Sequence, residues 1–264
     1  MFKKQIDFQL KKMTKTRSLA IFPVFALFLF SNHSAAQLKV IDVASFDKVI
    51  VSPHIQVIFR EGAKESVTIE SIKVPIEKLN VSVKNNTLSV YLEGAKITTG
   101  TKEEYVNHTK HRTSIYEGTI VRTIITYKTI NSLDLRGEER FVFESMLDTK
   151  NLRLHIYGES HVFLHKVAIQ NLKASIYGES YLEIMEGTVE KQKFTAYGET
   201  KINTLNIENT ETRLTAYGDG TFNFNVSKRL KITSYGEATI NYSGSPDLNK
   251  GIVIGESKIT KVNK

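Results

Sequence analysis

Residues 154–165 read LHIYGESHVFLH, and the tetrapeptide Tyr157-Gly158-Glu159-Ser160 within them returns along the chain with small changes. The glycines of the regular copies follow one another at steps of 20, 20, 20, 18 and 19 residues: Gly158, Gly178, Gly198, Gly218, Gly236 and Gly255. A degenerate copy, Arg136-Gly137-Glu138, lies 21 residues before Gly158. A period near 20 residues is typical of a stacked solenoid, whereas a propeller blade is about twice as long and would need two copies.

Apolar side chains lie at even distances from these glycines. Two residues before them stand Ile156, Ile176, Ala196, Ala216, Ser234 and Val253, and four residues after them stand Val162, Leu182, Ile202, Phe222, Ile240 and Ile259. A period of two predicts β-strands. Two short strands per repeat, with no helix between them, predict an all-β parallel β-helix, or β-solenoid, with about 20 residues per coil. Corresponding residues of successive coils should then lie about 4.8 Å apart in columns.

Two of the polar columns have an unusually constant charge. Five residues before the glycine the chain has Arg153, Lys173, Lys193, Arg213, Lys231 and Lys250, and one residue after it has Glu159, Glu179, Glu199, Asp219, Glu237 and Glu256. Like charges on neighbouring strands destabilise a sheet unless they are solvated, paired or used by a ligand. The basic column could discourage unwanted association or contact an anionic polymer.

The remaining residues of the motif are expected to shape and coat the coil. The glycine and the small residue two positions later have inward parity and predict a tight corner where opposite walls approach. Tyrosine stands one residue before the glycine, on the outward parity, in five copies: Tyr157, Tyr177, Tyr197, Tyr217 and Tyr235. Rings stacked at strand spacing would stabilise one another, and exposed rings could also bind a partner.

The first 36 residues resemble a cleavable signal peptide. Four basic residues between 11 and 17 precede the apolar run at 19–30, and the small residues Ser34, Ala35 and Ala36 follow it. The run has 12 residues, fewer than the roughly 20 that a membrane-spanning helix needs, so no transmembrane anchor is expected after cleavage. The prediction is export to the periplasm, to the cell envelope or out of the cell.

Residues 37–264 are expected to form a single β-solenoid domain, because no linker-like composition interrupts them. Residues 37–132 alternate less regularly and should cap one end, residues 96–118 within them read as a long loop or an edge insertion, and residues 133–264 carry the regular repeats. The tail near Lys264 is expected to close the other end.

Charge and cysteine content exclude several functions. The whole chain has 36 Lys and Arg against 28 Asp and Glu, and removal of residues 1–36, with six basic residues and one acidic residue, leaves 30 against 27. A net charge of 30 − 27 = +3 gives no general case for nucleic-acid binding. The absence of cysteine excludes disulfides, thiol catalysis and thiolate metal sites.

The chain resembles the bacterial family of putative auto-transporter adhesin head-GIN domain proteins over roughly residues 44 to 260. The segments that carry the resemblance are Phe46–Val51, Ile55–Phe59, Val67–Glu70, Asn86–Val90, Leu133–Gly137 and Leu230–Pro246. Where relatives usually have Gly-Ser-Gly at the corner, this chain has Tyr-Gly-Glu. The resemblance implies a right-handed β-helix, export, and no established enzymatic activity, cofactor or catalytic residue.

Three functions remain open from the sequence. The first is surface contact or adhesion, with the tyrosine column and the acidic residues Glu159, Glu179, Glu199, Asp219 and Glu237 as ligand-binding candidates and a glycan or an envelope or host surface component as partner. The second is a polysaccharide-cleaving enzyme, for which a reaction centre should break the repeat. The third is a structural envelope protein without a ligand. The oligomeric state is left open.

The histidines His155, His161 and His165 do break the repeat and are the candidates for a metal or proton-transfer site, with surface histidines as the simpler interpretation. Calcium on the acidic column is not expected, because one carboxylate per coil supplies too few of the six to eight oxygen ligands that Ca²⁺ takes. No metal and no cofactor are therefore predicted.

Overall fold

The computed structural model describes residues 38–106 and 109–263, so the predicted signal peptide lies outside the described residues. Nearly all the described secondary structure is β, with one short 3-10 helix, Ile76–Lys78. The strands of the first half are β1 Lys39–Asp42, β2 Lys48–Val51, β3 Ile55–Glu61, β4 Ser66–Ile72, β5 Leu79–Lys84, β6 Thr87–Leu92, β7 Thr101–Val106, β8 Thr109–Ser114 and β9 Val121–Tyr127. The described residues contain no helix long and apolar enough to cross a membrane.

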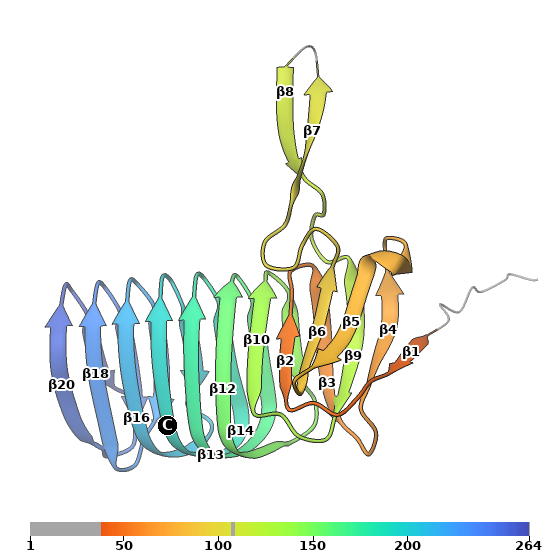
Figure 1. Cartoon of the computed structure of the whole chain (residues 1–264). Helices are drawn as coiled ribbons and strands as arrows, with labels where there is room; N and C mark the ends of the chain where they lie inside the picture. Colours follow the sequence, from red (N-terminus) through yellow and green to blue (C-terminus); the bar gives the residue numbers. More distant parts are fainter. Residues whose placement is uncertain (1–37, 107–108, 264) are drawn as a thin grey trace, which may run out of the picture. The chain divides into compact units, whose positions relative to one another are not determined.

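The repeats form a β-solenoid, as their period predicts. Its strands are β10 Ser132–Gly137, β11 Arg140–Phe143, β12 Leu147–Gly158, β13 His161–Tyr177, β14 Tyr181–Tyr197, β15 Lys201–Thr204, β16 Glu208–Tyr217, β17 Thr221–Asn225, β18 Arg229–Tyr235, β19 Thr239–Ser243, β20 Asp247–Ile254 and β21 Lys258–Lys261. Every pairing among them is parallel, and Figure 1 shows these strands side by side in one stack. In the middle coils, β13 and β14 run through a corner as single strands of 17 residues.

The core is the line of inward side chains predicted from the even positions. Ile156, Ile176, Ala196 and Ala216 are at most 1% exposed, and the column at four residues after the glycine is equally buried through Ile240. Buried phenylalanines belong to the same core: Phe194 stacks on Phe224 with ring centroids 5.6 Å apart. Because each coil buries its inward side chains against the next, the stack has a continuous core without disulfides.

The glycine corners are tight for a different reason from the one that the sequence suggested. All six repeat glycines have a positive φ, between 98° and 140°, which side-chain-bearing residues rarely adopt. A Cβ at any of them would come within 3.0 Å of the carbonyl oxygen of the glycine one coil earlier. Glycine is required because successive layers approach each other there, not because opposite walls of one coil do.

The small residue two positions after the glycine points inward, as expected. Ser160, Ser180 and Thr200 are fully buried, and each donates its hydroxyl hydrogen bond to the glycine carbonyl of the coil below. Their donor–acceptor distances are 2.8, 2.8 and 3.1 Å. These bonds fix each corner on the previous one, so the hydroxyl complements the glycine.

The N-terminal part ends the stack with antiparallel strands, consistent with the predicted cap. Antiparallel pairs join β1 to β4, β4 to β9 and β5 to β6. The expected loop at 96–118 is largely a hairpin, because β7 and β8 pair with each other as a separate two-stranded sheet (Figure 1). Apolar periodicity could not reveal it, since its cross-strand contacts are charged, as in the pair of Glu103 with Lys110 at 2.7 Å.

The prediction that the C-terminal tail closes the other end is wrong for the described residues. Among the described strands β20 pairs only with β18, and β21 only with β19, so the tail continues the stack as one more coil. Ile252 and Ile254 are 57% and 59% exposed as a result.

Candidate functional site

The five tyrosines of the repeat form one ladder on the outside of the stack. The register pairs Tyr157 with Tyr177 and continues through Tyr197 and Tyr217 to Tyr235. Successive ring centroids are 5.1, 4.9, 4.8 and 5.0 Å apart, and the ring planes differ by no more than 4°. Residues 18 or 20 positions apart in the sequence are therefore direct neighbours in space, as predicted from the period.

The stacking determines which parts of the ladder a ligand can reach. The three interior rings, those of Tyr177, Tyr197 and Tyr217, remain 38–40% exposed although both of their faces lie against neighbouring rings. Their edges and hydroxyl groups are what faces solvent. A sugar ring therefore cannot lie flat on an interior tyrosine, and a ligand would bind across the edges of several rings.

The two ends of the ladder differ. The guanidinium of Arg136 lies over the ring of Tyr157 at 5.6 Å from its centroid and is held by Asp134 through hydrogen bonds of 2.8 and 3.2 Å. Burial, followed by the negative charge of Asp134, raises the pKa of Tyr157. At the other end Ile254 pairs with Tyr235, so the aromatic column stops there.

Two further columns run parallel to the ladder on the same outward face. Two residues before the tyrosines lie the half-buried His155, Ser175, Thr195, Thr215 and Thr233. Four residues before the tyrosines lie the basic residues Arg153, Lys173, Lys193, Arg213 and Lys231. The hydroxyl column was not recognised from the sequence. The face thus presents the same cation, hydroxyl and phenol pattern in four consecutive coils.

The assignment of Lys250 to the basic column is wrong. A β-bulge in β20 places Gly251 and Ile252 opposite the single residue Thr233. Lys250 therefore pairs with Ile232, and Asn249 lies opposite Lys231. The spacing of the glycines does not reveal this extra residue. The step from Gly236 to Gly255 is 19 residues, because the coil is shortened at another place.

The acidic column lies beyond the glycine corner and faces solvent. Glu159, Glu179, Glu199, Asp219, Glu237 and Glu256 are all exposed, and none forms an ion pair within 4.0 Å with another described residue. The Asp219 carboxylate accepts a hydrogen bond of 3.2 Å from the backbone N–H of Glu237. This arrangement agrees with a solvated, splayed column.

The three candidate histidines do not converge. His155 lies on β12 with its ring 6.3 Å from that of Tyr157, while His161 lies on β13 with its ring 6.1 Å from that of Tyr181. Within residues 38–106 and 109–263, no three His, Cys, Asp or Glu side chains gather in a way that could hold a metal ion. His165 likewise joins no such group.

A cavity of about 340 Å³ beside the first rung of the ladder was missed by the sequence reasoning. Glu139 lines it together with His54, Arg136 and Tyr157 and is only 4% exposed. Its carboxylate accepts a hydrogen bond of 3.0 Å from the N–H of Glu138, while burial raises the pKa of Glu139. The signal was present in the sequence, because Glu139 is a charged residue at the position where later copies have Ser, Thr, Gly or Ala.

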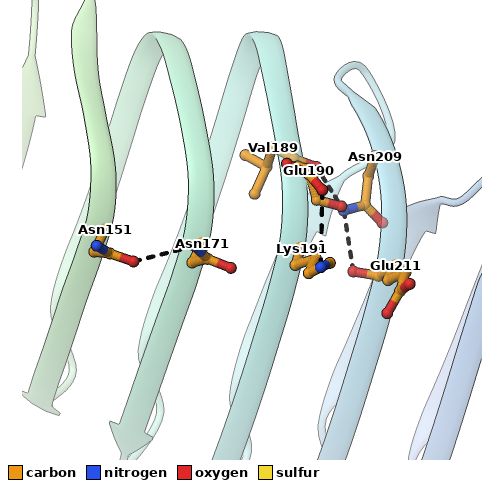
Figure 2. A network of polar contacts seen from close by, with 7 residues as sticks. All are labelled: Asn151, Asn171, Val189, Glu190, Lys191, Asn209 and Glu211. Carbon is orange, nitrogen blue, oxygen red and sulfur yellow. Dashed lines mark hydrogen bonds and ion pairs between the residues drawn. The ribbon is translucent and has the colours of Figure 1, made fainter.

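A polar network fixes the corner that precedes the basic column (Figure 2). Asn209 is 5% exposed, and its amide donates hydrogen bonds to the carbonyl oxygens of Val189 and Glu211 at 2.7 and 3.2 Å. In the coils before it, Asn171 donates to Asn151 at 3.1 Å. The bonds from Asn209 to Val189 and from Asn171 to Asn151 tie adjacent coils together at the edge of the basic face.

Comparisons with known proteins agree with this architecture. A family model described as "Putative auto-transporter adhesin, head GIN domain" matches residues 45–246, more than half of the chain. The search of curated proteins gave no match.

Several solved structures have a similar fold. A putative adhesin from Bacteroides fragilis is 19% identical with a TM-score of 0.71, and the alignment covers 85% of this chain and 96% of that one. A putative adhesin from Parabacteroides merdae is 16% identical with a TM-score of 0.62 and coverages of 86% and 95%. A putative lipid binding protein from Parabacteroides distasonis is 17% identical with a TM-score of 0.64 and coverages of 86% and 96%. At these identities the likeness shows the fold alone.

Proposed function

The chain belongs to the putative auto-transporter adhesin, head GIN domain family, and from that premise we propose that it is an exported, non-enzymatic protein that binds a linear glycan of the envelope or of a host surface. The family implies export, and the basic and apolar segment at the N-terminus is proposed as its cleavable signal. The coils are proposed to wind in the right-handed sense that connections between parallel strands prefer.

The observation that carries the proposal is the regularity of the tyrosine face. Five phenol rings repeat every 4.8–5.1 Å along the stack, beside a parallel column of mostly hydroxyl-bearing side chains. A ligand that also repeats, such as a polysaccharide chain with one sugar per coil, meets the same contacts at every step. Phenol and Ser or Thr hydroxyls can both donate to and accept from sugar hydroxyls.

The stacked rings also limit the loss of entropy on binding. Each interior tyrosine is already held between two others, so its side chain has little rotameric freedom left to lose. A flat, pre-ordered row of ring edges favours an extended ligand over a small compact one. The proposed binding mode is therefore lengthwise, along the axis of the coils.

The test is a binding survey with two matched variants. The parent protein and a variant with Tyr177, Tyr197 and Tyr217 all changed to Phe are applied to an array of linear envelope and host glycans. The Phe variant keeps the stacked rings and loses the hydroxyls, so it should fold with the same circular dichroism spectrum and lose at least tenfold in affinity. Changing the same three residues to Ser should abolish binding.

Two results would contradict the proposal. One is a parent protein that binds no glycan on the array, which would favour the purely structural alternative. The other is a glycan that binds both variants as tightly as the parent, which would move the binding site away from the ladder.

A further inference from the structure

A hollow of about 600 Å³ runs along the basic column, separate from the tyrosine ladder. We define the basic groove as this hollow, and its charged lining is Lys173, Lys191, Lys193, Arg213, Arg229, Lys231, Glu211 and Asp247. Six basic and two acidic side chains give it a charge of 6 − 2 = +4. By comparison, residues 37–264 as a whole carry only +3.

The four cations of the basic column in the groove, Lys173, Lys193, Arg213 and Lys231, are not neutralised by the protein, whereas Lys191 and Arg229 lie opposite Glu211 and Asp247, respectively, on neighbouring strands. No ion pair within 4.0 Å with another residue that the structure describes is formed by Lys173, Lys193, Arg213, Arg229 or Lys231. Lys191 makes only a 3.8 Å contact with Glu190. The charges of Lys173, Lys193, Arg213 and Lys231 are therefore available to a ligand.

The register increases the repulsion among these cations. Lys173 pairs with Lys193, Lys193 with Arg213, and Arg213 with Lys231, so like charges lie directly opposite one another on neighbouring strands. Such pairs destabilise a sheet. An anion lying across the strands would remove this repulsion.

The same stack neutralises charge elsewhere. Lys166 lies directly opposite Glu186 on the next coil, and the two form an ion pair of 2.7 Å. Opposite charges on adjacent coils are therefore compatible with this architecture. The unpaired basic column is a local feature of the groove and not a general consequence of stacking.

We infer that the basic groove binds a linear acidic polysaccharide, with the polymer lying along the axis of the coils and its anionic groups on successive cations. One cation per strand gives a spacing of about 4.8 Å, which is similar to the length of one sugar unit in an extended chain. The amides of Asn171 and Asn249 line the same groove and can bond to sugar hydroxyls.

The shape and lining of the groove favour this ligand over other polyanions. A hollow admits a chain more readily than the flat surface of an anionic bilayer. Single-stranded nucleic acids are usually held by aromatic side chains that stack on the bases, and no aromatic residue lines the groove.

The edge of the groove is built to hold its shape. Asn171 and Lys191 line the groove and belong to the corner drawn in Figure 2, where the amide of Asn209 bonds to the carbonyl of Val189 on the preceding coil and to that of Glu211 on its own strand. The backbone positions that carry the cations are thereby fixed before any ligand arrives. Only the long basic side chains need to be ordered on binding.

The groove is independent of the proposed tyrosine site. Within each coil the basic residue precedes the tyrosine by four positions, or about 13 Å along a strand. A single thin polymer in the groove would therefore not depend on the ladder, and each site can be disabled alone.

The experiment measures binding of polygalacturonate to the protein at low and at physiological salt. Neutral dextran, vesicles of anionic phospholipid and a single-stranded oligonucleotide serve as the competing probes. Polygalacturonate should bind at least tenfold more tightly than each of them, and its affinity should fall steeply as salt rises, because neutralising a polyanion releases counterions.

Two triple variants with the same change in net charge locate the site. Changing Lys173, Lys193 and Arg213 to Gln should weaken polygalacturonate binding at least tenfold and flatten its salt dependence. Changing the exposed, unpaired Lys84, Lys201 and Lys258 to Gln should weaken it less than twofold. The Tyr177, Tyr197 and Tyr217 to Phe variant should bind polygalacturonate like the parent, which separates this site from the proposed glycan site.

The inference is overturned if polygalacturonate does not bind, if vesicles or the oligonucleotide bind equally well, or if the two triple Gln variants lose affinity to the same extent. Loss of polygalacturonate binding in the Phe variant would also overturn it, because a single site on the ladder would then account for both ligands.

Discussion

The regular coils and the N-terminal part both alternate buried apolar side chains with outward side chains, but the two parts have different roles. Residues 132–261 pair only in parallel among themselves and place corresponding outward residues of successive coils in columns. Residues 39–127 include four antiparallel pairings and show no repeated outward column. Regular parallel coils generate a periodic surface. The antiparallel strands have no such repeated surface, but they cover an end of the stack that would otherwise expose unpaired backbone groups.

The two parts meet through shared strands. β10 pairs with β2 on one side and with β12 on the other, and β11 pairs with β3 and with β13. At this junction Phe59 stacks on Phe143 with ring centroids 4.2 Å apart. The N-terminal strands therefore provide the first layer on which the regular coils stack.

The largest effect is expected from breaking this junction. Phe143→Ala removes a fully buried ring that touches both parts and should lower the free energy of unfolding by about 3 to 5 kcal/mol. Urea unfolding measured by circular dichroism tests this value. Phe222→Ala, an equally buried change inside the regular coils, is the control: only Phe143→Ala should split the transition into two steps. A single step in both variants would show that the junction is not where the two parts separate.

A smaller loss should follow from a side chain at a repeat glycine. Gly178→Ala combines an unfavourable φ of 113° with contact against the carbonyl of Gly158, and it should cost about 2 to 4 kcal/mol. Gly118 in the N-terminal part also has a positive φ, 55°, but a Cβ there meets nothing within 4 Å. Gly118→Ala should therefore cost only about 1 kcal/mol. Equal losses in the two variants would contradict the layer-to-layer explanation of the corners.

The ladder predicts a coupling energy between coils. Tyr177→Ala and Tyr197→Ala, alone and together, form a double-mutant cycle whose interaction energy should be about 0.5 to 1.5 kcal/mol. Tyr105 in the β7–β8 hairpin is 73% exposed and belongs to no ladder, so Tyr105→Ala should change stability by less than about 0.5 kcal/mol. Additive losses at Tyr177 and Tyr197 would mean that their stacking contributes nothing to stability.

The smallest effect concerns Glu139, which occupies the small-residue position of the first, degenerate copy. Burial raises the pKa of Glu139 above its value in the unfolded chain. The folded state therefore holds this proton more tightly, so the free energy of unfolding falls as pH rises from the unfolded to the folded pKa. Glu139→Gln should remove this part of the pH dependence and raise the melting temperature at pH 7 by roughly 2 °C.

Calorimetry between pH 4 and pH 8 measures this effect. Glu138→Gln, the neighbouring substitution with the same change in charge, serves as the control for the loss of one carboxylate. A Glu139→Gln variant that is less stable than the parent at pH 7 would show that the ionised carboxylate is favoured in the fold.

Sequence alone predicted the features that depend on repetition. The spacing of the glycines predicted that Ile176 points into the core and that Tyr177 belongs to an outward ladder, because in a stack each period becomes one layer. It could not predict that the rings would lie parallel and cover one another's faces, since ring orientation depends on the exact distance between layers. The spacing also could not show whether Gly178 is required because it contacts the neighbouring layer or because it contacts the opposite wall of its own coil.

Most of the features that sequence reasoning missed break the repeat, although the overlooked hydroxyl column through Ser175 and Thr195 follows it. The bulge at Gly251 and Ile252 shifts Lys250 out of its column without changing the step between glycines by more than one residue. The β7–β8 hairpin is stabilised by charged contacts and carries no apolar period. The basic groove depends on how a corner folds, and no single residue type in the sequence marks the hollow beside it.

In this solenoid, residues one period apart lie in adjacent layers. The chain has no cysteine, so pairs of cysteines can be introduced without interference. Ser175, Thr195 and Thr215 form one outward column, and a short bifunctional thiol reagent that fluoresces only when both ends react measures which pairs are adjacent. The account predicts a strong signal for Ser175→Cys with Thr195→Cys and for Thr195→Cys with Thr215→Cys, and none for Ser175→Cys with Thr215→Cys, two layers apart. Equal signals from all three pairs, or no signal from the first two, would contradict it.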